Sequence, residues 1–322
     1  MRSLVLSANY SDRWNCVHEI FKQDLFDGKD VVFFGPGYPL WEERKYSAVA
    51  LMSRFDADIL FVFNSKNSRD WITDIELVKT TINYQVDYYP DRTHDSWRDN
   101  YITYNRFNIV IFPDRSKVDQ FLMRNKSKKL PITLYLPHGV NTALFKPSTS
   151  VVKDINVAAI MSINPIEYPR RNDIFKVLSK SDIPNLFLHK VIKTSDAIPL
   201  DKYINFIQSS RVTLQSCDRY KSAAIKCFEV MACGSVLFSD EALDYTSLGF
   251  IDGVNYIKYS NGNLKAIPKI LRRVLSDGCL VIRGRENLPL EQIAANGVDL
   301  ICRRHTNKHR ADKLWTFLKG VL

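Results

Sequence analysis

The sequence predicts an α/β protein of two domains, each built on a parallel β-sheet with helices on both faces. The chain has 322 residues, more than the ~250 at which a single hydrophobic core stops growing. Its 45% hydrophobic and 25% charged residues exclude a disordered or fibrous protein. Short apolar runs alternate with amphipathic stretches along the whole chain, which indicates strands joined by helices.

The predicted elements follow one another in two series. Strand-like runs of the first series lie at residues 4–7, 31–34, 59–63, 82–86, 109–112 and 132–136. The second series has strands at 157–161, 186–188, 212–215 and 236–238, helices at 201–208 and 223–232, and a helical ending over 288–318. Between the series, Pro137, Gly139 and Pro147 interrupt regular structure, so we expect a first domain of residues 1–148 and a second that begins at 149.

Charge, cysteines and apolar segments suggest where the protein works and what it binds. No run reaches the ~18 apolar residues that cross a bilayer, and the six cysteines lack C-x-x-C spacing, so we expect a cytoplasmic protein with reduced thiols. The net charge is +10, which suggests a polyanionic partner. Residues 1–150 contribute 20 − 18 = +2 and residues 151–322 contribute 25 − 17 = +8, so phosphate is expected at the second domain.

The most informative stretch is SAAIKCFEVMACGSVLFSD, residues 222–240, which predicts a helix capped by Ser222 and followed by a buried strand. Lys226 and Glu229 are three residues apart and share a helix face. A helix start and a lysine suit a diphosphate, and a carboxylate one turn later suits ribose hydroxyls. The alternative is a surface ion pair, which the spacing alone favours.

This stretch resembles the donor-binding segment of group 1 GT-B glycosyltransferases, enzymes with two Rossmann-like domains that face a cleft. The resemblance implies that Glu229 binds the nucleotide ribose and that Lys226 binds the phosphates. Many such enzymes have a second Glu eight residues earlier, where this chain has Lys221. That departure weakens the match to retaining enzymes and leaves the stereochemistry of transfer open.

Other matches follow in the order of the family. The segment LPHGVNTALFKP (136–147) is similar to its interdomain connection, and residues 248–262 and 293–315 resemble the ending of spore-maturation-type members. In such folds the last helix crosses back to the first domain. We therefore expect 306–322 to join the acceptor domain and 149–305 to form the donor domain.

Further candidate residues lie in loops of the two domains. Arg170 and Arg171 begin a helix, and the resemblance implies that one of them reaches the donor diphosphate. Ser162, His138 and Gly139 are candidate cleft residues, although a structural role for His138 is the interpretation we favour.

A catalytic base is expected at the carboxyl end of a first-domain strand, where open α/β sheets bind their ligands. Asp87 directly follows the strand at 82–86, and Asp91 lies four residues on. An inverting transfer needs one base to take the acceptor proton, and phage-type DNA β-glucosyltransferases carry such an Asp. We prefer Asp87 to Asp91, and turn-forming aspartates are the alternative for both.

No metal ion or other cofactor is expected. Asp56-Ala57-Asp58 imitates a D-x-D metal motif, but it stands before a strand, so we interpret it as a turn. His94, His138 and His305 lack partners at metal-ligand spacing. Lysine, arginine and the helix dipole can stabilise the leaving diphosphate instead.

The sequence therefore predicts a nucleotide-sugar-dependent hexosyl- or pentosyltransferase. The acceptor we favour is a hydroxylated base in duplex DNA, flipped out of the stack. A surface polysaccharide or glycan is the close alternative. Two alternatives come from other classes of protein. One is a GT-B-fold epimerase, which would isomerise its donor without an acceptor. The other is a non-catalytic nucleic-acid-binding protein, which would need neither Glu229 nor Asp87.

Overall fold

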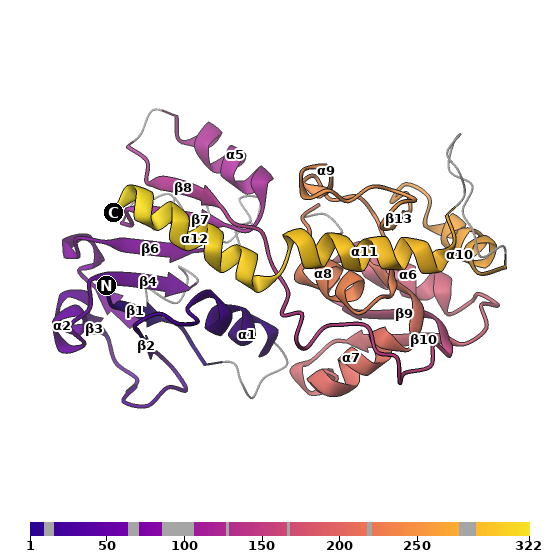
Figure 1. Ribbon diagram of the computed structural model, residues 1–322, viewed down its shortest axis with the longest axis horizontal. Helices are drawn as coiled ribbons and strands as arrows, with labels where there is room; N and C mark the ends of the chain where they lie inside the picture. Colours follow the sequence, from indigo (N-terminus) through magenta and orange to yellow (C-terminus); the bar gives the residue numbers. More distant parts are fainter. Residues whose placement is uncertain are drawn as a thin grey trace. The chain divides into compact units, whose positions relative to one another are not determined.

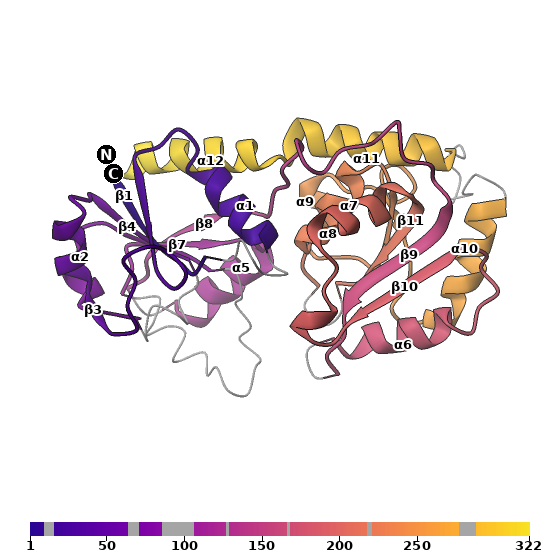
Figure 2. The same ribbon diagram turned by 90° about the horizontal axis from the view of Figure 1, so that it is seen from below.

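The computed structural model describes residues 1–9, 16–63, 71–85, 106–126, 129–165, 168–217, 221–276 and 288–322. The chain divides into two units (Figures 1 and 2). The first unit consists of Met1–Pro137 with Ala311–Leu322, and the second of His138–Arg310. The sequence placed these boundaries at 148 and 305. The connecting segment packs on the second unit instead, since Lys146 O accepts from Gln208 Nε2 at 2.7 Å.

The first unit has a six-stranded parallel sheet in the order β2-β1-β4-β6-β7-β8. The four inner strands of this order are buried along their whole length, as expected for a parallel sheet covered on both faces, and the two edge strands are only partly buried. The strands are β1 (Ser3–Leu6), β2 (Val31–Phe34), β4 (Ile59–Phe63), β6 (Thr81–Tyr84), β7 (Ile109–Phe112) and β8 (Ile132–Tyr135), with a separate pair β3 (Tyr46–Ser47) and β5 (Ile72–Thr73).

Helices pack on both faces of this sheet. Alternate strand residues point to opposite faces, so Leu4 and Leu6 join one core and Val5 joins the other. Helices α2 (Ala48–Arg54) and α5 (Arg115–Arg124) contribute to the core of Leu4 and Leu6. Helix α1 (Cys16–Leu25) and the last helix α12 (Asn307–Val321) contribute to the core of Val5. A short 3₁₀ helix, η1, spans Ile75–Leu77.

Helix α12 confirms the expected return of the chain to the first unit. Leu314 and Leu318 are fully buried in the first unit's core. Trp315 Nε1 donates to Leu25 O at 2.8 Å, and its ring meets Phe26 edge-on. These contacts anchor the C-terminal helix beside α1.

The second unit has a parallel sheet in the order β10-β9-β11-β12-β13. Its strands are β9 (Ile155–Ser162), β10 (Leu186–Val191), β11 (Ser210–Gln215), β12 (Val236–Ser239) and β13 (Ile257–Lys258). Its helices are α6 (Pro169–Leu178), α7 (Leu200–Gln208), α8 (Ile225–Ala232), α9 (Tyr245–Leu248), α10 (Ile267–Ser276) and α11 (Leu290–Arg304), with 3₁₀ turns η2 (Thr194–Asp196) and η4 (Leu264–Ala266). The fold is thus the predicted α/β fold with two parallel sheets.

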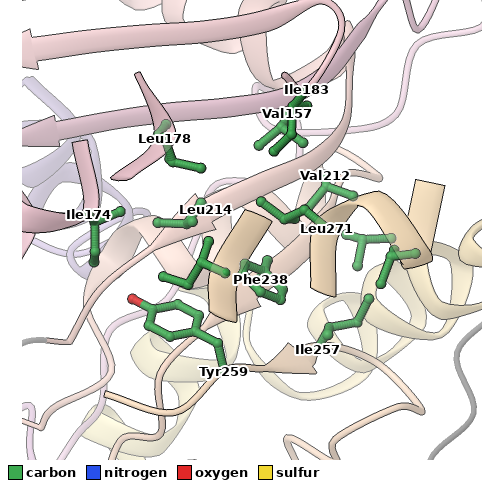
Figure 3. Close-up of a cluster of buried hydrophobic side chains, with 14 of the residues drawn as sticks. Val157, Ile174, Leu178, Ile183, Val212, Leu214, Phe238, Ile257, Tyr259 and Leu271 are labelled. Carbon is green, nitrogen blue, oxygen red and sulfur yellow. The ribbon is translucent and has the colours of Figure 1, made fainter. Parts of the chain in front are cut away.

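One face of the second sheet packs against α6, α10 and the start of α11. Figure 3 shows this core, in which Val157, Val212 and Leu214 of the central strands meet Ile174 of α6 and Leu271 of α10. All five side chains are fully buried. At about 25 cal/mol per Å² of apolar area, such residues hold the strands whose ends carry the polar groups described next.

The structure can also be compared with the expected reduced thiols and with the expected lack of a membrane-spanning segment. The thiols of Cys217, Cys227 and Cys233 are free and buried, as the sequence predicted, but Cys302 on α11 is exposed. Among the helices of the described ranges, none is long and apolar enough to cross a membrane.

Candidate functional site

Helix α8 carries Lys226 and Glu229 one turn apart, and it ends before Gly234, whose φ of +72° is a left-handed conformation that favours glycine. Glu229 is only 1% exposed and Lys226 is half-buried. Lys226 Nζ donates to Ile160 O of β9 at 3.3 Å. A surface ion pair, the alternative for this spacing, is therefore wrong.

The two carboxylate oxygens of Glu229 have different surroundings. Oε2 accepts a hydrogen bond from the Tyr203 hydroxyl at 2.8 Å. Oε1 is buried and has no hydrogen-bond partner within the described part of the chain. Burial raises the pKa of Glu229, while Lys226 and the Tyr203 hydrogen bond oppose that rise. Because an unpartnered buried acceptor costs about 1–3 kcal/mol, a ligand hydroxyl that donates to Oε1 would be stabilised there.

Lys226 is a cation that can change its charge near neutral pH. Its pKa is lowered to about 8, chiefly by burial; the Glu229 charge opposes this shift, and the nearby Arg171 charge adds to it. Its Nζ lies 5.2 Å from the centre of the Tyr203 ring. A bound anion would favour the charged form, so Lys226 suits a phosphate ligand.

Open α/β sheets bind their ligands in a crevice at the carboxyl ends of two neighbouring strands. At this point the order of the strands reverses, so the next strand along the chain lies to one side for the first strand and to the other side for the second. In the second unit these strands are β9 and β11, since β10 lies beside β9 on its far side. Arg171 spans their ends: its guanidinium donates to Ser162 O at 3.4 Å and to Ser216 O at 3.0 Å. It also stacks over the Tyr168 ring at 3.8 Å.

The structure also describes the other residues predicted to bind the donor, and it corrects the prediction for one of them. Arg170 precedes Arg171 in the first turn of α6 and is half-buried, and Ser162 is the last residue of β9. Ser222 is not the N-cap of α8. The helix begins at Ile225, and Ala224, with ψ of 151°, caps it. Since alanine has no side-chain acceptor, the cap residue does not bind the first-turn N–H groups, which suit an anion.

His138 and Gly139 have a structural setting at the start of the second unit. The Arg310 guanidinium donates two hydrogen bonds to His138 O, at 3.1 and 3.0 Å. A Cβ on Gly139 would lie 2.8 Å from Asn307 Oδ1, so a larger residue would not fit. These contacts involve the His138 carbonyl and Gly139, and the role of the His138 side chain stays a prediction.

His305 is a structural histidine. Its Nε2 donates to Leu248 O at 2.7 Å, and its Nδ1 accepts from Arg310 at 2.6 Å. Burial and the Arg310 charge together lower its pKa to about 3, so the ring stays neutral.

The predicted bases Asp87 and Asp91 lie outside the described residues, as does His94. The strand before them, predicted at 82–86, is β6 (Thr81–Tyr84). Gln85 continues the pairing, since its N–H donates to Ile111 O at 2.8 Å.

A buried ion pair that the sequence did not reveal lies at the end of β1. Lys22 Nζ donates to Glu19 at 2.7 Å, to Tyr38 Oη at 2.6 Å and to Ser7 Oγ at 3.0 Å. Burial lowers the pKa of Lys22. Burial also opposes ionisation of Glu19, but hydrogen bonds from Lys22 and Tyr38 hold the pKa of Glu19 below its usual value. Every donor of this lysine is therefore matched by an acceptor.

Metal-ligand residues do not gather anywhere in the described ranges: no three His, Cys, Asp or Glu side chains could jointly hold an ion there. Asp56 adopts a left-handed φ of 49°, and Asp58 Oδ2 accepts from Arg2 N at 2.8 Å. The predicted turn before β4 is confirmed at this place.

Comparison with known proteins agrees with this geometry. Residues 166–316 match the model of a family described as glycosyl transferase-like. The structure of Anabaena HepE in complex with UDP-glucose is similar with a TM-score of 0.72 at 13% identity, covering 99% of this chain and 100% of that one. Sucrose-phosphate synthase from Thermosynechococcus elongatus has a TM-score of 0.67 at 11% identity, covering 100% and 99%. No curated protein matches the sequence.

A glycosyltransferase from Rickettsia africae also has this fold, with a TM-score of 0.60 at 11% identity and coverage of 99% and 98%. The chain therefore has the fold of GT-B glycosyltransferases. The family match lies mainly in the second unit, His138–Arg310.

Proposed function

We propose that the second unit binds a nucleotide-sugar donor and that the enzyme transfers its sugar to an acceptor hydroxyl. The observation that carries this is the buried Oε1 of Glu229, which lies one turn from Lys226 and has no hydrogen-bond partner among the described residues. A nucleoside diphosphate offers ribose hydroxyls to the carboxylate and phosphates to the cation. HepE structures contain UDP and UDP-glucose, so UDP is the nucleotide we propose. Because Oε1 is shielded from water here, surrounding side chains must shift when the ribose binds.

The chemistry follows from the cations at the carboxyl edge of this sheet. Lys226, Arg171 with Arg170, and the N-terminus of α8 would hold the diphosphate and stabilise its charge as it leaves, without a metal ion. The acceptor oxygen attacks the anomeric carbon, and the bond to the diphosphate breaks with its electron pair on the diphosphate. The acceptor proton passes to a base, for which we propose Asp87, with Asp91 as the alternative.

The proposal is tested by Glu229→Gln. The amide keeps the shape of the side chain but has no charge, so we expect UDP to bind about 10- to 100-fold more weakly, as for the loss of a hydrogen bond to a charged group. Isothermal titration calorimetry measures this affinity, and circular dichroism shows whether the variant folds. Glu291→Gln, on the exposed first turn of α11, is the matched control and should bind UDP normally. A folded Glu229→Gln variant with normal UDP affinity would remove Glu229 from the donor site.

For the acceptor, we infer a hydroxylated base in duplex DNA, which the net charge of +10 supports, with a surface glycan as the alternative. The experiment supplies a nucleotide sugar with duplex DNA that contains 5-hydroxymethylcytosine, with the unmodified duplex, or with a polysaccharide. Mass spectrometry should detect a sugar on the hydroxymethylated duplex alone. Transfer to the polysaccharide alone would replace the DNA proposal with the glycan alternative.

A further inference from the structure

Tyr203 contacts both charged residues of the proposed donor site. It lies on α7, is 8% exposed, and packs edge-on against Phe145 at 6.4 Å between ring centres. Its hydroxyl donates to Glu229 Oε2 at 2.8 Å. The face of its ring lies 5.2 Å from Lys226 Nζ. One side chain from a neighbouring helix therefore orders the carboxylate and the cation together.

The hydrogen bond assigns different tasks to the two oxygens of Glu229. A tyrosine hydroxyl has a single hydrogen, and here it is donated to Oε2. The carboxylate is thereby held in one orientation, and Oε1 is the oxygen left without a partner among the described residues. Without the Tyr203 hydroxyl, the carboxylate would have two unpartnered oxygens and no fixed orientation.

We propose that Tyr203 is a positioning residue of the donor site, which occupies Oε2 of Glu229 so that Oε1 alone accepts from the ribose. This inference rests on the proposed function, since it assumes that Glu229 binds the donor. Tyr203 does not touch the reacting atoms in this account, and it acts through Glu229 and Lys226.

Tyr203 also affects the ionisation of Glu229. Burial raises the pKa of Glu229, and the Lys226 charge and the Tyr203 hydrogen bond lower it. Further ionisable groups near this pair, among the described residues, are Cys233, a thiol whose pKa burial raises to about 12, and Arg171, which acts on Lys226. Loss of the Tyr203 hydroxyl should therefore raise the pKa of Glu229. Since the ribose needs the ionised carboxylate, UDP affinity should then decline at a higher pH as the solution is acidified.

The test compares UDP binding to the full chain with and without this hydroxyl, by calorimetry across the acidic range. Tyr203→Phe should bind UDP about 10-fold more weakly, and its acidic decline should begin at a higher pH. Tyr259→Phe is the matched control, because that buried hydroxyl in the same unit donates to Gln215 O at 2.9 Å. It should keep the wild-type pH profile. The titration of UDP itself is common to all variants and cancels in the comparison.

The outcomes separate this inference from the proposed function. If the wild type does not bind UDP, the proposed function fails. If Glu229→Gln weakens binding but Tyr203→Phe matches the wild type, the role of Tyr203 is wrong and the donor site stands. Equal pH shifts in Tyr203→Phe and Tyr259→Phe would show a general structural effect and overturn the inference. The pKa of Glu229 measured by carbon NMR without ligand must also rise in Tyr203→Phe, a result independent of UDP affinity.

Discussion

Replacement of Asp87 by Asn is expected to lower the rate of sugar transfer about 10²- to 10⁴-fold, the usual effect of losing a general base. The affinity for the donor should stay nearly unchanged, because we place the donor on the second unit and the base on the first. Single-turnover kinetics measure the rate, and calorimetry measures UDP affinity. Asp91→Asn is the matched control and should lose much less activity.

Two other results would change this assignment. A greater loss in Asp91→Asn would identify Asp91 as the base. Normal rates in both variants would mean that the enzyme is retaining or takes its base from elsewhere. Proton NMR of the product distinguishes these last two, since an inverting enzyme yields the anomer opposite to that of its donor.

Loss of both proposed phosphate ligands should have a comparably large effect on binding. Each charge-assisted hydrogen bond contributes about 1.5–3 kcal/mol, so Lys226→Met with Arg171→Met should weaken UDP binding about 10²- to 10⁴-fold. Uridine has the ribose but no phosphate, so its affinity should change much less. Lys176→Met, an exposed change on the same helix as Arg171, should leave both affinities unaltered. Equal losses for UDP and uridine would show that the two cations do not bind phosphate.

Lys226 should also make UDP binding weaker at basic pH. Because burial lowers the pKa of Lys226 to about 8, its charge is lost as the pH rises through that value, and UDP affinity should fall there. Lys226→Arg keeps its charge at high pH, so this variant should lose the basic decline. A chelator should not change UDP affinity if these cations take the place of a metal ion.

The periodicity of the sequence predicted the sheets well. The runs at 31–34, 59–63 and 109–112 coincide with β2, β4 and β7, because buried parallel strands are continuous apolar segments that turns and helices bound sharply. The strands β3 and β5 have two residues each, which is too short for a periodic pattern in the sequence. The helical ending at 288–318 is two helices, since the chain breaks at His305, whose ring is held by tertiary contacts.

The candidate site was predicted only where its residues are close in sequence. Lys226 and Glu229 share a helix face, so their spacing was visible, whereas Tyr203 meets Glu229 across 26 residues of chain. No local pattern distinguishes that tyrosine from any other aromatic residue on an amphipathic helix. The cap at Ser222 was wrong because the extended backbone at Ala224 delays the helix to Ile225. Propensity favours a serine cap, but the local backbone conformation decides where the helix begins.

The two points at which the chain passes between the units are joined to each other. Val140 N donates to His305 O at 3.1 Å, and Asn307 N donates to Val140 O at 2.9 Å. The second unit is thus inserted into the first along the chain, and hydrogen bonds within the second unit hold its beginning next to its end. Exchange of residues 138–310 as one segment would keep Arg310 together with the His138 carbonyl that it binds, whereas an exchange that includes only one of these two residues would combine them from different proteins.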